Sequence, residues 1–107
     1  MVEFLEQLQE HTRAVEEIGN RIECGENYME EVRSYLPSLN QIVTEIFQMK
    51  QEPGIFPDLN PEFVIQVLND ILYGMEHEDA VFLLDVLRYG LMEIYNYIET
   101  ELKSEEA

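Results

Sequence analysis

The sequence predicts an all-α fold, a four-helix up-down bundle built from two helical hairpins, and three observations support this prediction. Apolar residues recur every three or four positions, which is the period of an amphipathic helix. Pro, Gly and Asn interrupt the pattern where a helix would end. Hydrophobic residues make up 46% of the 107 residues, enough for one core. The expected helices cover about residues 2–23, 27–50, 61–75 and 79–103 of a single domain, residues 1–107.

The first predicted helix has one apolar and one acidic side. At 100° per residue the apolar side contains Phe4, Leu8, His11, Val15, Ile18 and Ile22. His11 is therefore expected in the core or at its boundary, held by a hydrogen bond. Gly25 suits the C-terminal cap of this helix, and Asn27 suits the N-cap of the next one.

The second predicted helix contains Pro37, which removes a backbone donor and crowds the preceding turn. The apolar stripe nevertheless keeps its phase from Tyr28 to Phe47. Pro37 falls on the polar side, where water can reach the freed carbonyl of Arg33. The pattern favours one helix kinked near Pro37, and two shorter helices are the alternative.

Residues 51–60 are rich in Pro, Gly and Asn and are expected to form a loop. Asn60 followed by Pro61 is a strong start signal for the third helix. Asp79 is placed to cap the fourth helix. The third helix is expected to bury Phe63, Val64, Val67, Leu68, Ile71, Leu72 and Met75.

The fourth predicted helix has an apolar arc wider than a simple bundle helix needs. It is therefore either central in the fold or supplies a second interface, such as that of a homodimer. Leu91, Tyr95 and Tyr97 are candidate interface residues on or beside this arc. Gly74 and Gly90 lie within or beside apolar faces, which predicts a close approach of helices at both positions.

The charge is the most unusual property of the composition. Twenty-three acidic and six basic residues give a net charge of −17 and a pI of about 4.1. Such a field repels nucleic acids and anionic membranes, and it would attract a basic protein partner. A merely solvated acidic surface, common in bacterial cytoplasmic proteins, is the alternative interpretation.

A cytoplasmic location is expected. Cys24 is the single cysteine, so no disulfide within the chain can form. The first residues lack the basic-then-apolar pattern of a signal peptide, and no uncharged apolar run approaches the ~18–20 residues of a membrane span.

No catalytic, cofactor-binding or metal-binding residue is expected. Cys24 lies between Glu23 and Glu26 at a helix C-terminus, where its pKa would rise and its nucleophilicity would fall. Neither His11 nor His77 has the Glu three residues earlier that di-iron bundles use. The five glycines are isolated and form no phosphate loop.

Three further side chains are candidates for a partner interface. Tyr73 falls on the polar arc of the third helix and should be exposed. Ile55 and Phe56 lie in the long loop between two prolines, where they either cover the end of the bundle or anchor a partner.

The last third of the chain resembles the closing helix of uncharacterised small acidic all-helical proteins of Gram-positive bacteria. The resemblance depends on the pattern Asp79-x4-Leu84-Asp85-x-Leu87-x-Tyr89-x-Leu91. That family has no assigned activity, so the resemblance implies no site residues. Where the family usually reads Glu-Tyr-Glu-Leu, this chain has Arg88-Tyr89-Gly90-Leu91.

These observations favour a non-catalytic protein that acts by protein–protein interaction, with homodimerisation as one form of it. The alternative is an inhibitor that mimics nucleic acid and binds a basic nucleic-acid-binding protein. An enzyme of unrecognised type is a third hypothesis, which a pocket with converging polar groups would favour.

Overall fold

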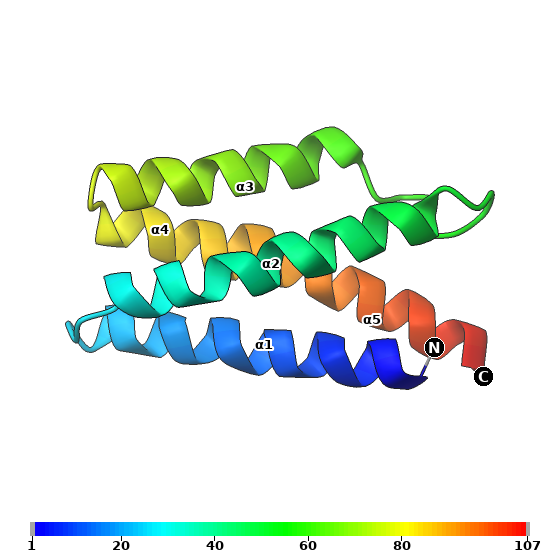
Figure 1. Ribbon diagram of the computed structural model, residues 1–107, viewed down its shortest axis with the longest axis horizontal. Coiled ribbons are helices and arrows are strands. Elements are labelled where there is room, and N and C mark those ends of the chain that lie inside the picture. Colours follow the sequence, from blue (N-terminus) through cyan, green and yellow to red (C-terminus); the bar gives the residue numbers. More distant parts are fainter. Residues whose placement is uncertain (1, 107) are drawn as a thin grey trace.

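The computed structural model describes residues 2–106 and has the predicted architecture of a four-helix bundle (Figure 1). Three helical segments at the C-terminal end follow one another without a break and act as one long helix. The elements are α1 (Val2–Glu23), α2 (Met29–Lys50), α3 (Pro61–Glu76), α4 (Ala80–Val86), the π-helical turn η1 (Leu87–Leu91) and α5 (Met92–Glu106).

The helices do not surround the core equally. α1 packs against α2 and against the long helix formed by α4, η1 and α5. α3 packs against α4 and η1, but α2 and α3 approach each other less closely than these pairs do. Figure 1 shows α1 and α3 at opposite edges, with α2 and the long helix between them. One side of the bundle, between α2 and α3, is therefore more open than the others.

The long helix is central, which explains the wide apolar arc predicted for it. Leu91 and Tyr95 are 1% and 0% exposed, so a partner cannot reach these two interface candidates in this structure. A fully buried Leu or Ile stabilises the fold by about 1.5–3 kcal/mol, and this helix supplies many of them. Its buried residues are Leu83, Val86, Leu87, Leu91, Ile94, Tyr95, Ile98 and Leu102.

Most predicted helix boundaries are confirmed. Gly25 has a φ of 73° after the end of α1, a left-handed conformation that glycine adopts without strain. The side chains of Asn60 and Asp79 cap α3 and α4 by accepting backbone N–H groups. The predicted Asn27 cap is wrong, because α2 begins after Tyr28 and makes no side-chain capping bond.

α2 continues through Pro37 as a single α-helix, so the alternative of two shorter helices is wrong. Pro37 is exposed. Water can therefore reach the carbonyl that lacks a donor at this position, and buried residues of α2 occur on both sides of Pro37, from Val32 to Ile46.

The predicted close approaches at two glycines are confirmed. A Cβ at Gly74 would lie 3.2 Å from the Cβ of Leu83, and one at Gly90 would lie 3.1 Å from a methyl of Val67. Gly90 belongs to η1, a π-helical turn that the periodicity did not predict. These contacts hold α3 tightly against the long helix.

One part of the predicted core is wrong. Phe63 and Leu72 are 42% and 53% exposed, although the apolar pattern of α3 placed both inside. Leu72 is exposed because it turns toward α2, which stands away from α3 at this position. Burial of this side of α3 would require a closer neighbour than the chain provides.

Candidate binding surfaces

A hydrogen-bonded chain closes the seam between α1 and α2. The Oη of Tyr35 lies 2.6 Å from Nδ1 of His11 and 2.7 Å from the Oη of Tyr95. Burial lowers the pKa of His11, partly opposed by the nearby Glu10 and Glu45. Burial also raises the pKa of Tyr35 to about 12. His11 is thus the hydrogen-bonded boundary histidine that the sequence predicts.

When His11 is neutral, both tyrosine hydroxyls of this hydrogen-bonded chain have an acceptor. When Nδ1 of His11 accepts, Tyr35 donates to it and Tyr95 donates to Tyr35. If His11 were protonated, the direction would reverse and the buried hydroxyl of Tyr95 would lose its acceptor. The arrangement therefore fastens α2 to α1 and α5, with Tyr95 fully buried and His11 and Tyr35 half-buried.

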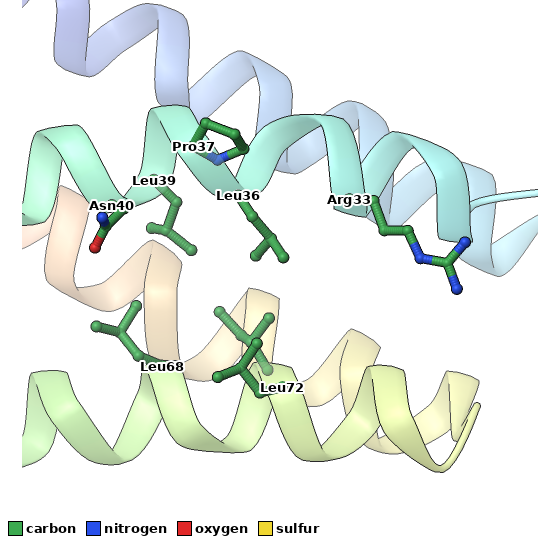
Figure 2. A pocket seen from close by; sticks show the side chains of 8 residues that line it. Arg33, Leu36, Pro37, Leu39, Asn40, Leu68 and Leu72 are labelled. Carbon is green, nitrogen blue, oxygen red and sulfur yellow. The ribbon is translucent and has the colours of Figure 1, made fainter.

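The opposite side of α2 faces an open apolar groove, the α2–α3 groove, of about 480 Å³. Figure 2 shows Leu36 and Leu39 of α2 pointing toward Leu68 and Leu72 of α3. Ile71 is 1% exposed and closes the floor of the groove. The lining residues are Arg33, Leu36, Pro37, Leu39, Asn40, Leu68, Ile71 and Leu72.

The lining is suited to apolar contacts. Arg33 and Asn40 are the two polar residues that line it, and neither is a nucleophile or a general base. Within residues 2–106, Arg33 has no carboxylate within 4.0 Å, whereas Arg21, Arg88 and Lys103 each form an ion pair. The groove thus combines leucine side chains with one guanidinium that is free to bind an acidic group.

The groove is also unusually poor in acidic residues. No Asp or Glu occurs from Val32 to Thr44 of α2 or from Phe63 to Asn69 of α3. In a chain with a net charge of −17, none of the eight residues that line the groove is acidic, and Asp70 of α3 instead accepts a hydrogen bond from Gln66. Sequence reasoning missed this site, although the stretch without Asp or Glu from Val32 to Thr44 was visible in the sequence.

A second surface lies at the turn between α3 and α4. The ring of Tyr73 stacks on His77 at 4.0 Å between centroids and meets the edge of Phe82 at 5.4 Å. Tyr73 is 51% exposed, as the sequence predicts. Nδ1 of His77 also lies 3.1 Å from the carbonyl oxygen of Tyr73, so the rings are held in a fixed group.

Acidic residues are the sequence neighbours of these rings. Glu76, Glu78 and Asp79 belong to the same turn, and all three are exposed. No Lys or Arg occurs between Lys50 and Arg88, and none of the three acids forms an ion pair in the described part of the chain. We call these six residues, the three rings and the three acids, the aromatic–acidic cluster.

The remaining interface candidates lie in or beside the loop after α2. Phe56 is buried, and its carbonyl accepts a 2.9 Å hydrogen bond from Nζ of Lys50. Tyr97 fastens the loop to α5, because its hydroxyl oxygen accepts a 3.0 Å hydrogen bond from the backbone N–H of Asp58. Ile55 is half-buried and packs against the core. The loop therefore covers the end of the bundle.

Of the interface candidates from the sequence, Tyr73 is the one that is more than half exposed; Leu91 and Tyr95 lie in the core, Ile55 and Phe56 in the loop, and Tyr97 is half-buried on α5. No group of three metal-ligating side chains occurs within residues 2–106. None of the helices described is long and apolar enough to cross a membrane. Comparison with protein-family models, curated proteins and solved structures finds no match to this chain.

Proposed function

We propose that this chain is a non-catalytic interaction protein that binds a basic segment of another protein through the aromatic–acidic cluster. The observation that carries the proposal is the placement of the exposed Tyr73–His77 stack beside Glu76, Glu78 and Asp79. Arginine and lysine bind both aromatic faces and carboxylates, so the same cation can use both kinds of group.

The charge distribution supports this proposal. A net charge of −17 attracts basic segments over several ångströms before contact, which raises the association rate at low salt. The cluster then supplies the contact itself. A cation over an exposed ring contributes about 0.5–1 kcal/mol, so affinity should be modest and should require several cations.

The test uses the full chain and a flexible Gly/Ser peptide with four arginines, measured by fluorescence anisotropy at 50 and 300 mM salt. We expect binding that weakens at high salt and weakens a further two- to five-fold in Tyr73→Ala. Tyr89→Ala is the matched control, since Tyr89 of η1 is 69% exposed and lies outside the cluster. Equal affinities of the two variants would contradict the proposal.

A nucleic-acid-mimicking inhibitor is the second candidate. One observation favours it: Glu3, Glu6 and Glu10 are exposed along α1, with rises of about 4.5–6 Å between them. Such a row approaches the charge spacing along a DNA strand, about 3.4 Å. The test is competition with duplex DNA for a basic DNA-binding protein. Displacement by the wild type but not by a Glu3, Glu6, Glu10→Gln triple variant would favour mimicry.

A further inference from the structure

The apolar side of α3 that faces α2 lacks a cover. Ile65, Leu68 and Leu72 follow one another at helical spacing along this side. Ile65 and Leu72 are each more than half exposed, and Leu68 is partly exposed above the floor of the α2–α3 groove. An exposed apolar stripe beside an apolar groove is typical of an interaction site.

The charge pattern decides which kind of partner fits. A basic partner would gain from carboxylates beside the leucines, yet none of the residues that line the groove is Asp or Glu. A partner that is itself strongly acidic needs such a face, because every carboxylate brought to the contact would add repulsion. The absence of acids on this one apolar face therefore favours a partner of the same charge.

We propose that a second copy of this chain covers the α2–α3 groove. Two copies with a net charge of −17 each can meet through this face without bringing lining carboxylates together, because the lining has none. A two-fold pair brings the same patch from both copies together, so leucines of one copy enter the groove of the other. Arg33, which lines the groove and has no ion pair within the described chain, lies within this contact.

The size of the face limits the strength of the pair. α3 has 16 residues and is about 24 Å long, and two helices side by side are roughly 20 Å wide. The footprint is thus roughly 500 Å² per copy, below the ~800 Å² of a standard interface. We expect a dimer that dissociates in the micromolar range.

The experiment is analytical ultracentrifugation of the full chain between about 1 and 500 μM at 50, 150 and 500 mM salt. The wild type should shift from monomer to dimer as concentration rises. The dissociation constant of the dimer should be at least three-fold lower at 500 than at 50 mM salt, since salt screens the repulsion between the copies. Leu72→Glu and Ile65→Glu should weaken the dimer at least ten-fold. Tyr89→Glu should dimerise like the wild type.

Three outcomes would overturn the proposal. The first is a wild type that stays monomeric at 500 μM and 500 mM salt. The second is a dimer that is lost in Tyr89→Glu and kept in Leu72→Glu, which would place the contact on the exposed side of η1. The third is a monomer whose Leu36 and Leu68 methyl resonances shift on addition of a leucine-rich amphipathic peptide, which would assign the groove to a heterologous helix.

The two proposals can fail separately. Tyr73→Ala should leave the dimer unchanged, because Tyr73 faces away from the groove toward Phe82. Leu72→Glu should leave arginine-peptide binding unchanged within about two-fold. Far-UV circular dichroism and thermal unfolding of each variant check that these exposed substitutions leave the fold intact.

Discussion

The two seams on either side of α2 are built from different chemistry. Toward α1, a continuous chain of hydrogen bonds joins His11, Tyr35 and Tyr95. Toward α3, leucines face one another across an open groove without a polar contact between the two helices. α2 is therefore fastened on one side and unpartnered on the other.

This difference shows how one helix can serve both stability and binding. Hydrogen bonds have directional requirements, so the α1–α2 seam specifies where α2 lies. Apolar contacts are not directional, so the groove side of α2 can accept any complementary surface without rearranging the bundle. The closed seam stabilises the fold, and the open seam is available to a partner.

The largest expected effect on stability distinguishes the buried Ile71 on the floor of the groove from the exposed Leu72 at its edge. Ile71→Ala should lower the free energy of unfolding by about 2–5 kcal/mol, because a buried side chain is lost and a cavity remains. Leu72→Ala, one residue away and half exposed, should change it by less than about 1 kcal/mol. Urea unfolding at a protein concentration below that of dimer formation measures both. Similar losses would mean that the groove is closed in solution.

A smaller effect is expected at the closed seam. Tyr35→Phe leaves both Nδ1 of His11 and the hydroxyl of Tyr95 without a partner. We expect a loss of about 1–3 kcal/mol in the free energy of unfolding. Tyr28→Phe is the control, since this half-buried tyrosine of the same region makes no side-chain hydrogen bond in the described structure. A loss of unfolding free energy no larger than that of the control would contradict the stabilising role of the His11–Tyr35–Tyr95 hydrogen bonds.

The smallest effect is a pH dependence of the closed seam. Burial lowers the folded-state pKa of His11 below 6.5, so the unfolded chain takes up a proton at higher pH than the folded chain does. The stabilisation from neutral His11 is therefore complete above pH 6.5 and declines as pH falls below it. The slope is at most about 1.4 kcal/mol per pH unit.

The measurement is the free energy of unfolding of the wild type and of His11→Gln between pH 5 and 8. The carboxylates contribute nearly equally to the pH dependence of unfolding in both proteins. The difference between the two free energies of unfolding therefore reports chiefly on His11. The difference should shrink as pH falls below 6.5. A difference that stays constant over this range would show that His11 titrates alike in the folded and unfolded chains.

Local signals in the sequence were sufficient to predict the helices and most of the residues at which they begin and end. Asn60 before Pro61, Asp79 before α4 and Gly25 after α1 act on their own backbone neighbours, so their effect can be read without knowing the fold. Asn27 was misassigned because a capping residue has an effect only where the helix actually begins, and α2 begins two residues later than predicted.

The candidate site was less predictable. Tyr73 was correctly expected at the surface because its position on the helix wheel is opposite the apolar side. Its stacking on His77 and its contact with Phe82 depend on how the α3–α4 turn folds, which periodicity does not report. A wide apolar arc looks the same whether it is central or at an interface, so periodicity does not distinguish the buried Leu91 and Tyr95 from interface residues.

The sequence by itself determined the helical class, the order of the helices and the acidic surface, because periodicity, capping and charge are properties of neighbouring residues. The tertiary structure alone decided that the long helix is central and that Leu72 is exposed. An apolar side chain is buried only if another element packs over it. Whether α2 covers α3 depends on the packing of the whole bundle, including the hydrogen bonds that hold α2 toward α1.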